Sequence, residues 1–404
     1  MGNNVFDIGC IGAGMAGALF LYKMAKDHKD VRMIIFDQGR PPAKRKRQME
    51  GFLGCFPSSD GKLYLSNLEK VSKIIPGRKV EKAHKFFNRM LSNLDNFCIS
   101  YDPLPSETFS EEFRKQGFNI LPNDYIQIMP KDVHAMSRMI TAEINEANKI
   151  SLSFDNEVFS VSKKDGMFIV ETEDGEFFCK KVVICVGRSG WRWCHNLFKR
   201  FGIIANNDIA RFGARIELNA NYMKEMNKSV CSLIRNDLEI GPFDWNGTVL
   251  PEDHMDHAIA GFRANEDRWK SEKVSFNMIG VRKFMNGGAE QVDRLGRLTF
   301  ILANERIMKE KVSYLIGGKS KISIIPEYDF LKNEILRLGE IIPEIITKAS
   351  MHTPTLIPGA GKINLSSKLE TEVDGMFVAG ESFGVSGLMA AAVTGIMAAD
   401  EIVK

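Results

Sequence analysis

The stretch Val5-Phe6-Asp7-Ile8-Gly9-Cys10-Ile11-Gly12-Ala13-Gly14-Met15-Ala16-Gly17 decides how the chain begins to fold. Its apolar first half is typical of a buried strand in a parallel sheet. Gly12 permits a tight turn, Gly14 lacks a Cβ so that a phosphate can approach the backbone, and Gly17 lets the next helix pack closely on the strand. The spacing therefore predicts a strand–turn–helix unit that binds the pyrophosphate of a dinucleotide.

A second apolar run, residues 31–36, ends at Asp37. In this type of unit, a carboxylate at the end of the second strand accepts hydrogen bonds from the adenosine ribose. The same negative charge disfavours a 2′-phosphate, so NADP is not expected at this position.

A glycine-rich segment near the other end of the chain narrows the choice of cofactor. It reads Asp374-Gly375-Met376-Phe377-Val378-Ala379-Gly380-Glu381 and is followed by Gly384 and Gly387. A second glycine–carboxylate loop indicates FAD, because the long ribityl chain of FAD must be held by a second element. Residues 382–399 carry no charge but are rich in small residues, which favours a buried helix over a membrane span.

The composition sets further bounds. The chain has 404 residues, 44% of them hydrophobic, and a net charge of +3. This length predicts one large or two interleaved domains, and the small charge gives no indication of binding to nucleic acid or an anionic membrane. The basic run Lys44-Arg45-Lys46-Arg47 is interpreted as a solvated loop, with capture of an acidic group as the alternative.

Seven cysteines are scattered without C-x-x-C spacing. This pattern predicts reduced thiols, no disulfide framework and no zinc site. His254 and His257 are three residues apart but have no thiol nearby, and no metal site is expected. With no signal peptide before the first strand, the expected localisation is cytoplasmic.

The order of the predicted elements indicates an α/β fold. A Rossmann-type FAD-binding domain with a parallel sheet and a β-meander crossover carries an inserted α+β substrate domain; Asp165-Gly166 and Asp174-Gly175 mark hairpin turns of the meander. The discontinuous FAD-binding domain is predicted at residues 1–70, 130–205 and 350–404, and the substrate or cap domain at 71–129 and 206–349.

Several motifs resemble those of FAD-dependent oxidoreductases of the two-dinucleotide-binding (Rossmann) superfamily, most of all the group of uncharacterised FAD-dependent dehydrogenases. Besides the fingerprint, they are Gly51-Phe52-Leu53-Gly54, Ser59-Asp60-Gly61-Lys62-Leu63, Val182-Val183-Ile184-Cys185-Val186-Gly187-Arg188-Ser189 and Phe212-Gly213-Ala214-Arg215-Ile216-Glu217. The chain departs from that group because residues 276–280 lack its cysteine-rich C-x-C-P-G-G stretch, so chemistry that depends on those thiols does not carry over.

The resemblance implies a set of cofactor-binding residues. They comprise the pyrophosphate-binding turn, the ribose-binding strand end, an adenine-edge strand position, the adenosine-side glycine and the C-terminal loop with its helix: Gly12, Gly14, Met15, Ala16, Gly17, Asp37, Gln38, Val158, Gly187, Gly380, Glu381, Gly387, Leu388 and Met389. The helix that starts at the last three of these is expected to lie beneath the isoalloxazine and to stabilise negative charge on reduced flavin.

For the chemistry, Lys62 is the candidate acid, base or anion-stabilising group, with a surface lysine after a turn as the alternative. Arg215 and Glu217 share one face of a strand and are predicted to bind substrate or to form a structural ion pair. The function expected is an FAD-dependent dehydrogenase or reductase for a small molecule, with NAD(P)H or another electron partner lacking a dedicated domain. The alternatives are a flavoprotein that modifies RNA, DNA or protein, and a redox-silent FAD-binding protein.

Overall fold

The computed structural model describes residues 5–41, 44–45, 48–94, 97–254, 256–264, 267–284, 287–357 and 361–404. The chain forms two compact units, each discontinuous in sequence. Unit 1 contains Met1–Cys98, Ile126–Asn206 and Gly359–Lys404, and unit 2 contains Ile99–Tyr125 and Asn207–Pro358.

Unit 1 is built on a seven-stranded sheet in the order β7-β2-β1-β10-β9-β8, with β21 paired to β10. Neighbours among β7, β2, β1, β10 and β21 run parallel, whereas β8, β9 and β10 are joined as an antiparallel meander. The predicted parallel sheet and β-meander are therefore present. The strands are β1 (Val5–Ile11), β2 (Met33–Asp37), β7 (Ile150–Phe154), β8 (Val158–Lys164), β9 (Met167–Thr172), β10 (Gly175–Ile184) and β21 (Met376–Val378).

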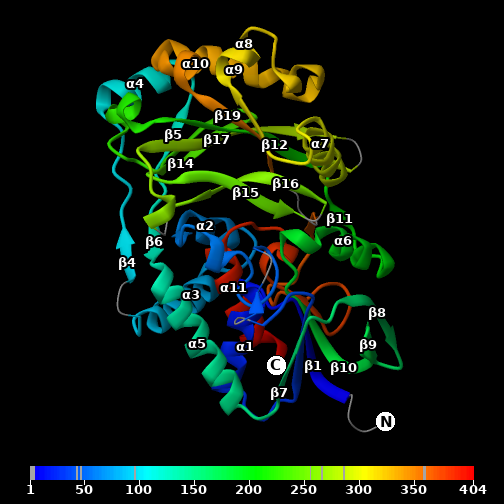
Figure 1. Ribbon diagram of the computed structural model, residues 1–404. Helices are drawn as coiled ribbons and strands as arrows, with labels where there is room; N and C mark the ends of the chain where they lie inside the picture. Colours follow the sequence, from blue (N-terminus) through cyan, green and yellow to red (C-terminus); the bar gives the residue numbers. More distant parts are fainter. Residues whose placement is uncertain are drawn as a thin grey trace. The chain divides into compact units, whose positions relative to one another are not determined.

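Helices and short strands complete unit 1, and α1, α5 and α11 run together beside the sheet (Figure 1). The helices are α1 (Met15–Asp27), η2 (Phe56–Ser58), α2 (Ser66–Ser72), α3 (Gly77–Leu91), α5 (Pro130–Glu146), η3 (Arg188–Gly190), α6 (Trp191–Arg200), η8 (Gly380–Phe383) and α11 (Leu388–Ile402). A three-stranded sheet has the order β3 (Lys62–Tyr64), β6 (Tyr125–Ile128) and β4 (Phe97–Ser100). A two-stranded sheet pairs β11 (Ala205–Asn206) with β20 (Lys362–Ile363).

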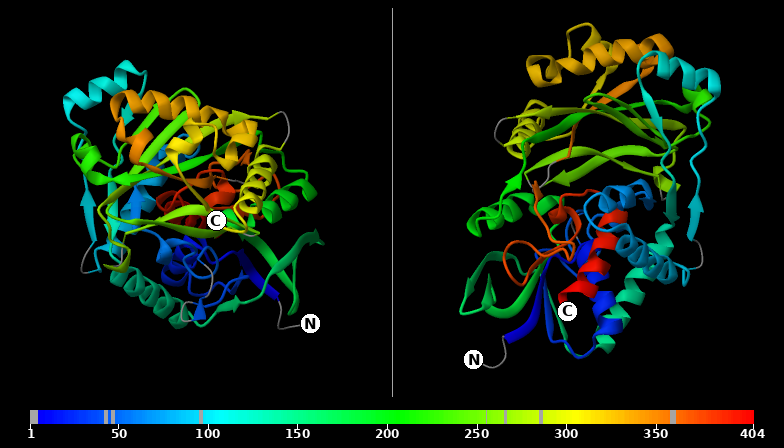
Figure 2. Two further views of the ribbon diagram at one scale, coloured as in Figure 1. Left: turned by 45° about the horizontal axis from the view of Figure 1, so that its top comes forward. Right: turned by 180° about the vertical axis from the view of Figure 1, so that it is seen from behind.

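Helices α1 and α11, which lie near opposite ends of the sequence, are in close contact (Figure 2). A Cβ placed on Gly395 would lie 2.1 Å from the carbonyl oxygen of Ala16, so only glycine allows the two helices to approach this closely. At the other end of the contact, Lys23 pairs with Asp400 at 3.2 Å. The C-terminal helix is thus part of the same core as the first βαβ unit.

Unit 2 is an α+β unit around a second seven-stranded sheet, order β18-β19-β12-β17-β14-β13-β5. Helices α8, α9 and α10 cover one face, and the β15–β16 hairpin lies over the other (Figure 2). The strands are β5 (Asn119–Leu121), β12 (Ile209–Asn219), β13 (Ser232–Arg235), β14 (Leu238–Trp245), β15 (Thr248–His254), β16 (His257–Arg263), β17 (Lys273–Lys283), β18 (Met308–Lys311) and β19 (Ser350–Leu356). The helices are α4 (Glu107–Lys115), η4 (Ala220–Met226), η5 (Asp267–Trp269), α7 (Gly288–Leu302), α8 (Val312–Ile316), η6 (Lys321–Ile324), η7 (Pro326–Tyr328), α9 (Asp329–Ile341) and α10 (Glu344–Lys348).

The largest differences between the unit boundaries and the predicted domain boundaries lie in two places. Residues 71–98, predicted as cap, belong to unit 1, because α3 packs on α11 and Lys79 pairs with Glu401 at 2.9 Å. Residues 350–356, predicted in the FAD-binding domain, form β19 and pair with β12 in unit 2. In both places hydrophobic periodicity alone could not identify the partner element.

Among the described residues, no helix combines the length and the apolar character that a membrane crossing requires.

The α1–α11 contact gives a test of the fold. In Gly395→Ala, overpacking against the Ala16 carbonyl should outweigh the gain of about 1 kcal/mol in helix propensity, for a net loss of about 1–2 kcal/mol in the free energy of unfolding. Gly77→Ala is the control, since a Cβ there has no atom within 4 Å and should change stability by less than about 0.5 kcal/mol. Denaturant unfolding measures the free energy of unfolding of both variants. Equal stability of the two would contradict the packing assigned to Gly395.

Candidate functional site

The predicted cofactor residues of unit 1 gather at the carboxyl ends of the parallel strands. Gly12 follows β1, and its N–H donates to the Phe36 carbonyl in β2 at 2.8 Å. The turn after β10 is tied to β1 by the N–H of Cys185, which donates to the Ile11 carbonyl at 2.8 Å, and the turn after β21 is tied to β10 by the N–H of Ala379. Ligands of open α/β sheets bind at this edge.

Two fingerprint glycines are required by the protein itself. Gly12 has φ +100°, and a Cβ there would lie 2.7 Å from the carbonyl oxygen of Cys185. A Cβ on Gly17 would lie 1.9 Å from the carbonyl oxygen of Gly12. Both residues therefore serve the turn and the helix–strand packing, whether or not a ligand is bound.

Gly14 is different, because little of the protein fills the space beside its Cα. The nearest heavy atom to a Cβ placed there is the Cα of Gly54, at 4.0 Å. Gly14 is the N-cap of α1, and no side chain caps the helix or places an acidic group in its first turn, where Met15 and Ala16 are buried. The unsatisfied N–H groups and the positive end of the helix dipole are thus available to an anion.

Asp37 holds the surrounding loops in place. Its Oδ2 accepts the N–H of Ala13 at 2.6 Å, and its Oδ1 accepts the N–H groups of Gly39 at 2.7 Å and Gly51 at 3.0 Å. Burial raises the pKa of Asp37, while these three hydrogen bonds oppose the rise. Because a carboxylate offers about four acceptor positions, room for roughly one ribose hydroxyl remains.

Arg45 fixes the loop that crosses the start of α1. Its guanidinium donates to the carbonyl oxygens of Gln48, Phe52 and Gly54, and burial lowers its pKa. Arg45 is therefore used inside the protein and is not part of a solvated basic loop. Lys44 is exposed, and Lys46 and Arg47 lie outside the described residues.

The adenosine side of the predicted site is also assembled in unit 1. The N–H of Asn156 donates to the Asp37 carbonyl at 3.1 Å. This bond holds Asn156 beside the end of β2, and buried Val158 follows two residues later, at the start of β8. Gln38 is exposed next to Asp37. A Cβ on Gly187 would meet no atom within 4 Å, so this turn, like Gly14, leaves open backbone at the strand ends.

The C-terminal loop lies against the start of α1. A Cβ on Gly380, whose φ is +68°, would lie 2.9 Å from the Cβ of Ala16. Glu381 accepts the Ser386 hydroxyl at 2.7 Å and pairs with the Nε of Arg188 at 3.5 Å. The fingerprint and the C-terminal glycine–carboxylate loop therefore lie against one another in unit 1.

The loop ends at Gly387, with φ +120°, which is the N-cap of α11. As predicted, Leu388 and Met389 open this helix; Met389 is buried and Leu388 half-buried. The first turn of α11 holds no acidic residue and no side chain caps it, so α11 is a second helix with free N–H groups in unit 1.

Lys62 lies on β3, which packs against α11. Its Nζ is 2.9 Å from the Oδ2 of Asp60, and the Lys62 side chain is only 11% exposed. The segment after β3 contributes a residue that the sequence did not single out: the Nδ2 of Asn67 lies 2.2 Å from where a Cβ of Gly387 would be. No spacing or motif marks Asn67 in the sequence, since only the folded chain brings it to α11.

Arg215 and Glu217 lie on β12 of unit 2, and each pairs with a different set of side chains. Arg215 is buried and donates to the Oδ2 of Asp244 at 2.8 Å and to the Ser275 hydroxyl at 3.0 Å. Glu217 pairs with the Nζ of Lys273 at 3.0 Å and with the Nε2 of His352 at 3.4 Å. Both residues therefore have structural partners on neighbouring strands, and a role in substrate binding stays a prediction.

The surroundings of Glu217 determine its ionisation. Burial opposes the charged form, but the hydrogen bonds from His352 and Lys273 outweigh burial and lower the pKa of Glu217 to about 2. Burial also lowers the pKa of His352, although its hydrogen bond to Glu217 acts in the opposite direction. At neutral pH the carboxylate is charged and stabilised by its neighbours.

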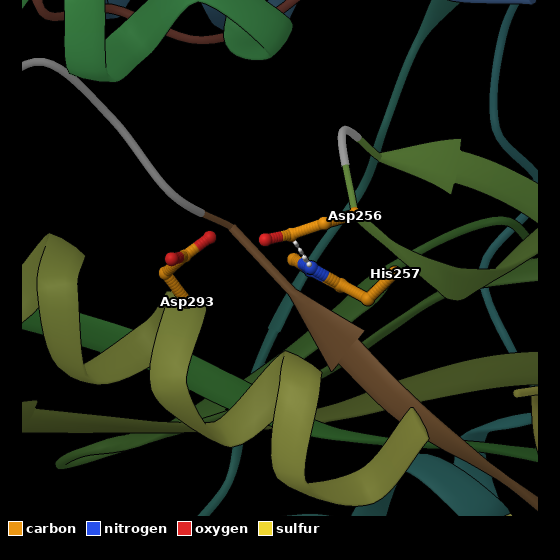
Figure 3. Close-up of side chains that lie close together, drawn as sticks. All are labelled: Asp256, His257 and Asp293. Carbon is orange, nitrogen blue, oxygen red and sulfur yellow. Dashed lines mark hydrogen bonds and ion pairs between the residues drawn. The ribbon is translucent and has the colours of Figure 1, made fainter. Parts of the chain in front are cut away.

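Asp256, His257 and Asp293 form a cluster in unit 2 whose ligand atoms lie within 4.8 Å of one another (Figure 3). The Nδ1 of His257 is 3.1 Å from the Oδ1 of Asp256. Arg297 lies 2.9 Å from a carboxylate oxygen of each aspartate. Because the guanidinium pairs with both carboxylates and would repel a cation, these contacts describe an ion-pair network.

All seven cysteines are free thiols. Burial raises the pKa of Cys179, Cys194 and Cys231 to about 12, so these three thiols are not poised for reaction as thiolates.

No protein-family model matches the sequence, and no curated protein matches it in a sequence search. Solved structures with a similar fold include glycine oxidase from Geobacillus kaustophilus, at 14% identity and a TM-score of 0.44 over 99% of this chain and 95% of that chain. A second is p-nitrophenol 4-monooxygenase PnpA from Pseudomonas putida, at 10% identity and a TM-score of 0.44 over 98% of this chain and 77% of that chain. A third is a flavoprotein/dehydrogenase from Cytophaga hutchinsonii, at 12% identity and a TM-score of 0.42 over 99% of this chain and 78% of that chain. All three TM-scores are below 0.5.

The environment of Glu217 predicts a pH dependence. A carboxylate whose pKa is lower in the folded state stabilises the fold above its unfolded pKa, and this contribution is lost as the pH falls. For Glu217 the loss runs from about pH 4.5 to about pH 2, and the Glu217→Gln variant should lack it. Its midpoint of thermal unfolding should therefore fall less steeply over this range than that of the wild type. Glu111→Gln, at an exposed position, is the control, and parallel curves for Glu217→Gln and wild type would contradict the assigned pairing.

Proposed function

We propose that unit 1 binds FAD and that the protein is an FAD-dependent oxidoreductase acting on a small molecule. The observation that carries the proposal is the open backbone at Gly14, the N-cap of α1. An anion bound there is stabilised by the helix dipole and by free N–H groups, and the remaining acceptor position of Asp37 suits a ribose hydroxyl.

FAD explains the site better than a shorter flavin nucleotide. FMN has no adenosine and only one phosphate, so it would leave Asp37 without a ribose even if its phosphate lay at Gly14. The second loop, from Gly380 to Gly387, supports the same choice because it joins the fingerprint to the start of α11 within unit 1. A cofactor that has two phosphates and a long ribityl chain matches two helix N-termini joined by such a loop.

The bound flavin would supply a centre that accepts a hydride or electrons, and the protein supplies orientation and proton transfer. Asp60 stabilises the charged ammonium of Lys62, which suits a proton donor or a cation that stabilises a developing anion. The chain holds one Gly-x-Gly-x-x-Gly fingerprint, so NAD(P)H or another electron partner would act without a dedicated domain.

A small-molecule substrate is favoured over a macromolecule by the position of Arg45. The macromolecular alternative relied on the basic run at residues 44–47 for docking, and Arg45 instead binds three backbone carbonyls inside unit 1. This leaves the described part of that run with one exposed lysine, Lys44.

The cofactor proposal is tested by two glycine variants. In Gly14→Val the new side chain occupies the space that the pyrophosphate needs, so FAD binding should be abolished while the apoprotein remains folded. In Gly12→Ala the new Cβ meets the backbone of Cys185, so the fold itself should be destabilised. FAD titration followed by fluorescence, with thermal unfolding of each apoprotein, separates the two effects. Near wild-type affinity for FAD in Gly14→Val would show that the phosphate site is misplaced.

The role of Lys62 is tested by Lys62→Met. Loss of a general acid or base typically costs about a hundred- to ten-thousandfold in rate, so we expect flavin reduction to slow within that range while FAD stays bound. Lys131→Met, at an exposed position of α5, is the control and should change the rate by no more than a few fold. Rapid mixing with a substrate found by screening for flavin bleaching measures both. An unchanged rate and pH profile in Lys62→Met would exclude the catalytic assignment.

A further inference from the structure

Asn67 is a buried amide that the fold does not use. The residue is 7% exposed and lies in α2. Within the part of the chain that the structure describes, its side chain makes no hydrogen bond. An amide that no protein group satisfies keeps its two donors and its acceptor available to a ligand.

The position of the amide shows where such a ligand would be. A Cβ on Gly387 would lie 2.2 Å from the Nδ2 of Asn67 and 3.1 Å from its Oδ1. Glycine at this position therefore leaves room for the amide directly against the N-cap of α11. The uncapped first turn of α11 and the Asn67 side chain thus present hydrogen-bonding groups at one place in unit 1.

Three features of this place favour a ligand group that gains negative charge. The start of α11 has free N–H groups and the positive end of a 15-residue helix dipole. No acidic residue lies in the first turn. Lys62, whose Nζ carries a positive charge, lies five residues before Asn67 on β3, which also packs on α11.

We propose that the Asn67 amide donates a hydrogen bond to the flavin ring of bound FAD, at the side of the ring where negative charge grows on reduction. This inference rests on the proposed function, because the fingerprint around Gly14 takes the pyrophosphate and leaves the flavin end for α11. Asn67 then binds the reduced cofactor more tightly than the oxidised one and raises the midpoint potential of the flavin. It is a cofactor-binding residue that tunes the reaction and transfers no proton.

The test compares Asn67→Ala and Asn67→Asp with wild type. Removing a hydrogen bond to a charged group should weaken binding of reduced over oxidised FAD by about tenfold, which lowers the midpoint potential of a two-electron couple by about 30 mV. The aspartate variant keeps the size of the side chain but adds a negative charge, so its potential should fall further. Asn93→Asp makes the same charge change at an exposed position of unit 1 and should leave the potential unchanged.

Two measurements keep this inference separate from the proposed function. FAD titration of each apoprotein shows whether the cofactor binds, and redox titration against a dye of known potential measures the midpoint. Potentials of Asn67→Ala and Asn67→Asp equal to that of wild type, with FAD bound, would overturn the role of Asn67 alone. Failure of the wild-type protein to bind FAD would overturn the proposed function instead. If Asn67→Asp does not fold, Asn67→Ala decides the question.

Discussion

The carboxylate of Asp37 is the interaction on which the candidate site depends. It stands at the end of β2 and accepts three backbone N–H groups, one from the fingerprint turn at Ala13 and two from the loop at Gly39 and Gly51. Burial raises its pKa, and these three donors oppose the rise because they favour the charged form. The carboxylate therefore fixes the turn that presents Gly14 and, at the same time, the loop that passes beside it.

Other buried charges extend this principle to the rest of unit 1. Arg45 donates to three carbonyl oxygens of the loop at residues 48–54. The same loop donates the N–H of Gly51 to Asp37. One buried cation and one buried anion therefore hold this loop in place. Glu381, Arg188 and Ser386 hold the C-terminal loop in a similar way. Close helix packing also contributes, because the approach of α1 to α11 requires glycine at position 395. Rigid loops with open backbone at chosen points are what a large phosphate-bearing cofactor needs.

Much of this arrangement could be predicted from local sequence. The fingerprint from Gly12 to Gly17 specifies its own strand, turn and helix, because Gly12 adopts a positive φ at the turn and Gly17 must pass the carbonyl oxygen of Gly12. The β-meander was predictable for the same reason, since its turns at Asp165-Gly166 and Asp174-Gly175 are local. The start of α11 at Leu388 followed from Gly387.

Other features depend on contacts between distant segments and left no local signal. The amphipathic pattern of α3 fits packing on either unit, and only the folded chain shows that its apolar face and its ion pairs meet α11 in unit 1. Arg215 was recognisable as a charged residue on a strand, but its partner Asp244 lies on β14, which pairs with β17 and not with β12. Asn67 is an ordinary polar residue in a short helix until the fold brings Gly387 against it.

The central claim is that the carboxylate of Asp37 and the backbone at Gly14 hold the adenosine half of FAD. A structure of the protein crystallised with FAD tests it most directly. The account predicts a ribose hydroxyl within hydrogen-bond distance of the Asp37 carboxylate, with the pyrophosphate over Gly14 at the start of α1. A well-defined FAD bound elsewhere, or bound with its adenosine away from Asp37, would contradict the account.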